Sequence, residues 1–242
     1  MLEKFKKAIK HEKEFVKIRS LKHLVITTHG IKLWAEKEKK TIEEAYKKSF
    51  ELLDEIMDLQ ITQNIPILTV YLMPEGLARK DYFHVFLNEL IGFFEKLLSS
   101  EQLSNKKIKV SILGKWYDLP GRAVEPIKEI IEETRDYDAF FLNFCINYNG
   151  QEEIVDACKL IARQVKAEKL DVDAINKELI KDNVYSSYFL PPDLIIKNGE
   201  RQTSGILLWD SPYTRIYFTD KLWPAFTKHD FLNAVKEYQK ES

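Results

Sequence analysis

Six short apolar segments, separated by longer helical patterns, are the feature of this sequence that most limits its fold. They are rich in β-branched and aromatic residues and nearly continuous in apolar character, as strands buried on both faces are. The predicted strands are His23–Thr28, Ile67–Met73, Ile108–Leu113, Ala139–Ile146, Leu194–Lys197 and Arg215–Phe218. Because strands that alternate with helices over short links pair in parallel, the pattern predicts an α/β fold with a mostly parallel central sheet of about six strands flanked by helices.

The segments between the strands repeat apolar residues at the 3.6-residue spacing of amphipathic helices. The predicted helices are Thr41–Gln60, Asp81–Leu98, Pro126–Thr134, Gln151–Val165, Val172–Lys181 and Lys228–Tyr238, with an N-terminal helix within residues 1–20. Thr41 and Glu44 have the spacing of a capping box, which predicts a helix start at Thr41. The sequence contains no internal repeat or low-complexity linker, so we expect residues 1–242 to form a single domain.

The predicted helix Asp81–Leu98 is apolar on more than one face. A helix of this kind is either enclosed by the rest of the protein or borders an apolar cavity. The residues that would line such a cavity are Phe83, Phe86, Leu87, Leu90 and Phe94. Ordinary burial in the core explains each of them equally well, so both interpretations stay open at the level of sequence.

Charge and apolar content exclude several classes of protein. The 37 Lys and Arg residues against 38 Asp and Glu give a net charge of −1, which argues against a dedicated nucleic-acid binder. The longest apolar stretches, Ala139–Phe144 and Gly205–Trp209, fall short of the roughly 18–20 residues that cross a bilayer, so we expect at most peripheral membrane contact. Cys145 and Cys158 do not suggest a disulfide framework, and the N-terminus lacks the apolar centre of a signal peptide; a cytoplasmic location follows.

Polar segments follow the predicted strands, and ligands of open α/β sheets bind outside the carboxyl ends of the strands. These segments are Thr27–Lys32, Pro74–Arg79, Gly114–Trp116, Asn147–Gly150 and Asn198–Ser204. Their basic residues, together with backbone N–H groups near the glycines, are expected to converge on an anion such as a phosphate. The basic residues concerned are Lys32, Arg79, Lys115, Lys197 and Arg201. A chance basic rim is the competing explanation, since the chain contains 37 basic residues.

The order and spacing of several motifs resemble the cis-prenyltransferase family, the undecaprenyl diphosphate synthases and their relatives. The resemblance covers roughly Leu21 to Tyr238 and is strongest near the C-terminus. The matching pieces are Gly30 with Trp34-Ala35, Leu142-Asn143 continuing to Asn147–Val155, Pro192–Ile196, Ser204 with Leu207–Trp209, Ile216–Asp220 and Leu222–Pro224. Any one of these motifs alone is weak, but their shared order makes accidental similarity improbable.

The resemblance implies a reaction in which an allylic diphosphate is ionised and condensed with isopentenyl diphosphate, while the growing prenyl chain runs down an apolar tunnel. It implies that the helix Asp81–Leu98 lines this tunnel through the five apolar residues named above. It places His29 and Glu75 as candidate catalytic residues. The residues that it places at the substrate diphosphates are Gly30, Lys32, Arg79, Lys197, Gly199, Arg201, Ser204 and Arg215.

Several polar residues of the family's site are replaced by other residue types in this chain. The family's first motif resembles Asp-Gly-Asn-x-Arg-Trp-Ala, and here His29 replaces the Asp that helps to hold Mg²⁺ and Leu33 replaces the Arg. The Glu that would complete the metal site falls on Arg215, and the family's next His falls on Tyr46. Mg²⁺ prefers oxygen ligands and an Arg repels a cation, so we expect no bound metal or other cofactor.

Three hypotheses remain. In the first, the protein is a catalytically degenerate relative that binds a prenyl phosphate or diphosphate or acts as a partner subunit, as a homodimer or a heterodimer with an active cis-prenyltransferase. The resemblance implies that the dimer contact lies in Leu207–Pro224. In the second, it is an active polyprenyl diphosphate synthase with an altered site, and only this alternative leaves room for bound Mg²⁺. A metal-independent form of it would use Lys32 and Arg215 to neutralise charge and His29 or Glu75 as base. The third is an unrelated small-molecule role on the same scaffold.

Overall fold

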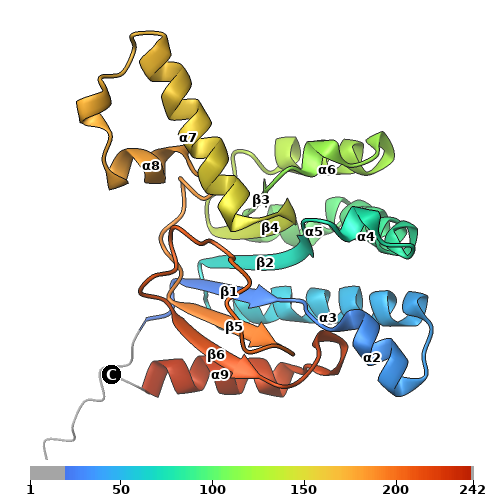
Figure 1. The fold of residues 1–242 in the computed structure, drawn as a ribbon. Coiled ribbons are helices and arrows are strands. Elements are labelled where there is room, and N and C mark those ends of the chain that lie inside the picture. The colour runs from blue at the N-terminus through green and yellow to red at the C-terminus, as the bar shows by residue number, and fades with distance from the viewer. Residues whose placement is uncertain (1–19, 241–242) are drawn as a thin grey trace, which may run out of the picture.

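One six-stranded sheet organises the computed structural model, which describes residues 20–240. Its strand order is β3-β4-β2-β1-β5-β6, and every neighbouring pair runs parallel (Figure 1). The strands are β1 (His23–Thr27), β2 (Ile67–Pro74), β3 (Ile108–Leu113), β4 (Phe140–Tyr148), β5 (Leu194–Asn198) and β6 (Arg215–Thr219). The predicted parallel α/β fold is confirmed, and each strand lies within two residues of its predicted bounds.

Helices cover both faces of the sheet. They are α2 (Ile31–Glu38), α3 (Ile42–Thr62), α4 (Phe83–Leu98), α5 (Glu101–Lys106), α6 (Gly121–Glu133), α7 (Gly150–Lys166), α8 (Lys177–Asn183) and α9 (Lys228–Lys240). Short 3₁₀ turns lie at Leu77–Arg79, Trp116–Asp118, Val172–Ala174 and Trp223–Ala225. Helices α3, α4, α6 and α9 supply apolar residues to the core on one face, whereas α7 and α8 pack together on the other side of the sheet (Figure 1).

The helices differ from prediction in a few places. The helix predicted over Val172–Lys181 is split, because the Asn176 side chain accepts the Leu179 N–H at 2.8 Å and starts α8 anew. Helix α6 begins at Gly121 and contains Pro126, which costs it one backbone hydrogen bond without ending it. Helices α2 and α5 were not predicted at all. The expected N-terminal helix of residues 1–20 lies almost wholly outside the described residues.

The first turns of α3 and α7 are each capped by a side chain. Thr41 forms the predicted capping box, with its side chain accepting the Glu44 N–H at 3.2 Å and its own N–H donated to Glu44 at 2.8 Å. Asn149 caps α7 by accepting the backbone N–H groups of Gln151 and Glu152. The cap at Asn149 directly follows β4, so it holds the start of α7 at the carboxyl edge of the sheet.

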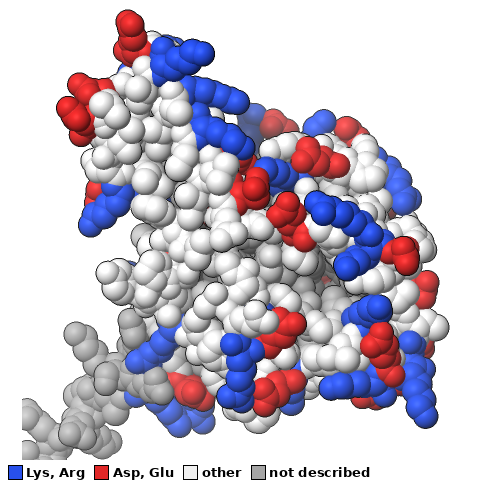
Figure 2. Space-filling model, viewed as in Figure 1, with Lys and Arg blue, Asp and Glu red and all other residues white. Residues whose placement is uncertain are grey.

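The charged surface is mixed. On the face shown in Figure 2, Lys and Arg side chains alternate with Asp and Glu rather than gathering in a basic stripe. The mixed distribution on this face agrees with the small net charge of the chain. Within residues 20–240, none of the helices is both long enough and apolar enough to cross a membrane.

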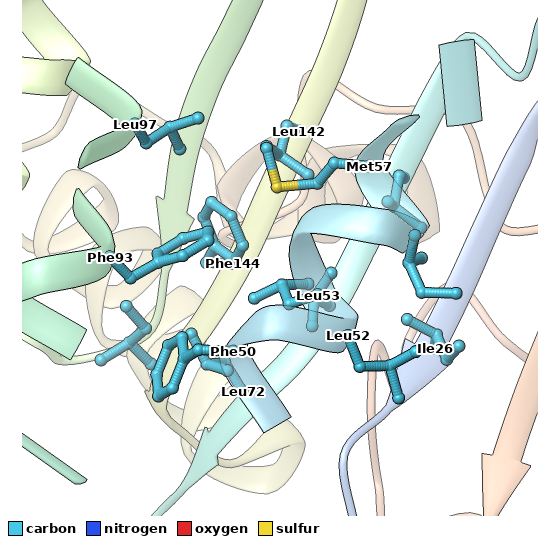
Figure 3. Packing of buried hydrophobic residues seen from close by; sticks show 14 of the residues in the cluster. Ile26, Phe50, Leu52, Leu53, Met57, Leu72, Phe93, Leu97, Leu142 and Phe144 are labelled. Atoms are coloured by element: carbon cyan, nitrogen blue, oxygen red, sulfur yellow. The ribbon is translucent and has the colours of Figure 1, made fainter. Parts of the chain in front are cut away.

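Helix α4, which is apolar on more than one face, packs in the main core. Figure 3 shows its residue Phe93 beside Phe144 of β4 and near Leu53 of α3. Phe93 and Phe94 both meet the Phe144 ring edge-to-face, at centroid distances of 5.6 and 5.4 Å. Leu90 is fully buried as well. Helix α4 is therefore buried between α3, α6 and the sheet, as either core or tunnel-wall residues would be.

Candidate functional site

The centre of the site is a contact between His29 and Lys197. His29 follows β1, and Lys197 is the fourth residue of β5, the neighbouring strand. The Lys197 Nζ atom lies 3.1 Å from His29 Nδ1, and the lysine is 0% exposed. The sheet order β2-β1-β5 therefore joins two side chains that are 168 positions apart in sequence.

Burial dominates the electrostatics of this pair. Desolvation lowers the pKa of Lys197 to about 8, an effect that the nearby Glu200 partly opposes. Desolvation, reinforced by the charge of Lys197, lowers the pKa of His29 to about 4. At neutral pH the pair thus carries its positive charge on Lys197, and the imidazole of His29 is neutral. A base of such low pKa abstracts protons poorly at neutral pH.

A pocket of about 180 Å³ opens at His29. Its polar end contains His29, Gly30 and Lys32, and the rest of its wall is mainly apolar and aromatic, formed by Ile31, Leu33, Tyr46, Tyr71, Leu72, Pro74, Leu77 and Tyr82. Gly30 has φ = 86°, and a Cβ there would lie 2.5 Å from Leu222 Cδ2, so the tight turn into α2 requires glycine. The pocket therefore combines a polar end, whose one cation among the described residues is Lys32, with a mainly apolar wall; Lys32 also lies 3.7 Å from Glu36 at the surface.

Two further pockets lie beside the first. One of about 370 Å³ contains Glu75, Arg79 and Lys115, and the other, of about 390 Å³, contains Ser204. Glu75 lines both of them, and Tyr71 and Pro74 line both the Ser204 pocket and the His29 pocket, so the three form a row along the sheet edge.

The two candidate catalytic residues lie in different pockets of this row. Glu75 accepts a hydrogen bond from the Asn149 amide at 2.8 Å, and it does not line the His29 pocket. Lys115 is paired with Glu152 at 2.7 Å and with Asp156 at 3.5 Å, which offsets its charge. The predicted convergence of basic residues is therefore only partial, and the catalytic roles of His29 and Glu75 stay predictions.

Two predicted diphosphate residues, Arg201 and Arg215, lie away from His29, whereas Gly199 lies close to it. Arg201 is exposed and ion-paired with Asp220 at 3.2 Å. Gly199 has φ = 72° and sits near the His29 carbonyl. Arg215 is the first residue of β6, where its N–H donates to Asp193 O at 3.2 Å at the amino end of the sheet. Within one chain it lies at the opposite edge from His29, and its role at a diphosphate stays a prediction.

The predicted tunnel residues lie behind the His29 pocket. Phe86, Leu87, Leu90 and Phe94 are buried in the core, and Phe83 is partly buried against it. Tyr46 lines the pocket wall and meets the Phe86 ring edge-to-face, with 5.6 Å between the ring centroids. These positions suit either core or tunnel wall, so the tunnel stays a prediction.

Sequence reasoning missed two residues of the site. Tyr71 of β2 donates to the Tyr148 carbonyl at 3.2 Å, and its ring centroid lies 5.7 Å from that of His29. In the sequence, Tyr71 could have been recognised as a hydroxyl-bearing side chain within an otherwise mainly apolar strand. Asn198 of β5 is buried, and neither of its side-chain amide atoms has a hydrogen-bond partner within residues 20–240. An unsatisfied buried amide next to Lys197 marks the end of β5 as a polar site.

Comparison with known proteins gives a consistent result. The sequence model of the family described as "Putative undecaprenyl diphosphate synthase" matches residues 28–242. The chain is 34% identical over 222 residues to a geranylgeranyl-diphosphate-specific tritrans,polycis-undecaprenyl-diphosphate synthase of Thermoplasma acidophilum, covering 90% of this chain and 86% of the relative. A synthase of the same name from Picrophilus torridus is 34% identical over 220 residues, with the same coverage.

Solved structures share the fold. Lavandulyl diphosphate synthase from Lavandula x intermedia, solved with dimethylallyl diphosphate, superposes with a TM-score of 0.87 at 23% identity and covers 94% of this chain and 97% of its own. A probable undecaprenyl diphosphate synthase from Campylobacter jejuni gives a TM-score of 0.73, also at 23% identity, over 93% and 97% of the two chains. The motifs, the all-parallel sheet and these matches lead to one conclusion: the chain belongs to the cis-prenyltransferase family.

Proposed function

We propose that this protein binds a prenyl diphosphate at the carboxyl edge of the sheet, with the diphosphate against His29, Gly30 and Lys32. The prenyl group would lie against the apolar wall of the same pocket, which includes Leu72 and Leu77. The observation that carries the proposal is the buried Lys197 ammonium behind His29, which has no carboxylate within ion-pair distance among the described residues. An uncompensated buried charge is costly, and an anionic ligand would offset that cost.

We also propose that binding does not need Mg²⁺, because the residues at this edge do not suit the metal. Nδ1 of His29 already faces Lys197, whose charge would repel a divalent ion nearby. Mg²⁺ prefers hard oxygen ligands, and His29 offers nitrogen. Among residues 20–240, no three His, Cys, Asp or Glu side chains are grouped as a metal site would require.

The same features support a catalytically degenerate role. The low pKa of His29 makes it a weak base, and Glu75 is hydrogen-bonded to Asn149 in a separate pocket.

Assembly with a second cis-prenyltransferase subunit, identical or active, would use the block Leu207–Pro224. In this block Tyr213 is 100% exposed, Leu208 and Phe218 are each 37% exposed, and β6 is an edge strand. Exposed apolar residues beside an open strand edge suit a subunit contact.

Active synthesis with an altered site is the second candidate. The observation in its favour is that the relatives named above, 34% identical over 90% of the chain, are named as synthases. In this reading Lys32 would neutralise diphosphate charge, and His29 or Glu75 would take the proton lost from isopentenyl diphosphate. Arg215, which the sequence also assigned to the diphosphate, lies at the amino end of the sheet and would not reach a ligand bound at the carboxyl edge of the same chain.

One experiment separates the candidates. The pure full chain is incubated with labelled isopentenyl diphosphate and geranylgeranyl diphosphate, in Mg²⁺ and in EDTA, with the Thermoplasma acidophilum relative as positive control. We expect no elongation, but calorimetric binding of geranylgeranyl diphosphate that persists in EDTA. Elongated product would overturn degeneracy and favour the second candidate, whereas a protein that neither binds nor elongates would overturn both. Native mass measurement of the complex tests the subunit contact.

A further inference from the structure

The structure contains two buried histidines in opposite hydrogen-bonding surroundings. His23 Nδ1 lies 2.6 Å from the Leu190 carbonyl oxygen and its Nε2 lies 2.8 Å from Thr69 Oγ1. His29 Nδ1 lies 3.1 Å from the Lys197 ammonium. A carbonyl oxygen only accepts and an ammonium only donates, so the two environments require opposite tautomers of neutral imidazole. His23 must carry its proton on Nδ1, and His29 must carry its proton on Nε2.

Nε2 of His29 is the nitrogen left for a ligand. The residue lines the 180 Å³ pocket together with Gly30 and Lys32, and within the described residues its Nε2 has no hydrogen-bond partner. We propose that Lys197 is a positioning residue that holds His29 in the Nε2–H tautomer, so that the ring donates a hydrogen bond to a diphosphate oxygen in this pocket. The inference rests on the proposed function and assigns His29 the role of donor rather than base.

Lys197 is better explained by this role than by stability. A lysine that is fully buried beside a neutral ring loses hydration that one hydrogen bond does not restore. Replacement by Met, of similar length and apolar, removes that cost. Lys197→Met is therefore expected to raise the melting temperature while it weakens anion binding, the combination typical of residues kept for function.

The first test observes the tautomers directly. The full chain is labelled with ¹⁵N-histidine, and long-range ¹H–¹⁵N spectra are recorded at pH 7 without ligand, with His29→Gln and His23→Gln variants for assignment. We expect the Nε2–H pattern at His29 and the Nδ1–H pattern at His23, which serves as the internal control. A His29 ring protonated on Nδ1 overturns the inference, whatever the binding results.

The second test uses variants and inorganic pyrophosphate as the probe, in EDTA. Lys197→Met should abolish the single Nε2–H tautomer and weaken pyrophosphate binding about ten-fold or more, since a ligand hydrogen bond involving a charged group is lost. Lys197→Arg also offers only donors and should keep the tautomer. Lys181→Met is the matched control: it breaks the 2.6 Å pair with buried Asp210, so it should lower stability and leave pyrophosphate binding unchanged.

The failures of the two proposals are distinguishable. If Lys197→Met lowers stability and leaves both tautomer and binding unchanged, Lys197 is structural and the inference is wrong. If the wild-type protein shows Nε2–H at His29 but binds neither pyrophosphate nor geranylgeranyl diphosphate, the proposed function is wrong. The role of His29 as a donor to a diphosphate is then wrong as well.

Discussion

Replacing Gly150 by alanine should destabilise the protein, because this glycine lies where a helix and a turn approach most closely. Gly150 is the first residue of α7, and a Cβ built on it would lie 2.0 Å from the Gly205 carbonyl oxygen and 2.9 Å from Leu208 Cβ. Real Cβ contacts essentially never fall below 3.0 Å, so the turn would have to move by about 1 Å.

The turn that faces Gly150 resists such a movement. It contains Ser204, Gly205 and Leu207 at φ values of 56°, 65° and 44°. The Leu207 N–H donates to the buried Tyr148 hydroxyl at 3.0 Å. Overpacking costs about 1–3 kcal/mol, and a strained or lost buried hydrogen bond adds a comparable amount, so we expect Gly150→Ala to cost about 2–4 kcal/mol. For a domain of this size, that lowers the melting temperature by about 4–16 °C.

Gly121→Ala is the matched control, because Gly121 is also the first residue of its helix and has nothing within 4 Å of its would-be Cβ. It should be neutral or stabilise by about 0.5–1 kcal/mol, since alanine restricts the unfolded chain. Urea and thermal unfolding of both variants measure the difference. A Gly150→Ala protein as stable as Gly121→Ala would refute the close approach of the turn to α7.

Three further outcomes are expected. Burial lowers the pKa of His23 to about 4, so the unfolded state binds more protons than the folded state between about pH 4 and 6.5. The contribution of His23 to stability should therefore fall by up to about 3 kcal/mol as pH drops through that range. In urea titrations His23→Gln should reduce the dependence of stability on pH, leaving the part due to His29, whose pKa is also lowered to about 4; an unchanged slope would contradict this. Leu90→Ala should lower the free energy of unfolding by about 2–5 kcal/mol, because Leu90 is fully buried. Leu33→Ala, at an exposed position, should change it by less than about 0.5 kcal/mol. Equal effects of the two substitutions would mean that α4 does not pack as described. Thr41→Ala should lower the free energy of unfolding by about 1 kcal/mol, because it removes the N-cap of α3. Thermal melting followed by circular dichroism measures this loss, and an unchanged melting temperature would contradict the prediction.

Local patterns determined most of the architecture. Each strand could be predicted because a continuous apolar run is bounded by polar or turn residues, and the cap at Thr41 was readable from the spacing of two side chains. The position of Arg215 was also implicit in the sequence, since the first residue of a parallel strand lies at the amino edge of the sheet. The diphosphate role that the family's motif implies for Arg215 stays a prediction.

The short helices α2 and α5 could not be predicted from local sequence patterns. Helix α2 begins directly after the left-handed turn at Gly30, where Leu222 from the far end of the chain leaves no room for a side chain. Isolated helices of this length are marginal in water, so tertiary packing decides whether they form. The break at Asn176 is a local capping effect that a helical periodicity count does not register.

The sequence by itself determined the element order, the parallel sheet and the family, because these follow from periodicity and from motifs read along the chain. Only the tertiary structure decided the chemistry at the carboxyl edge. It placed β1 beside β5, buried Lys197 against His29 and kept Glu75 in a separate pocket. The physical reason is that pKa and tautomer depend on burial and on atoms a few ångströms away, and those neighbours come from positions 168 residues apart.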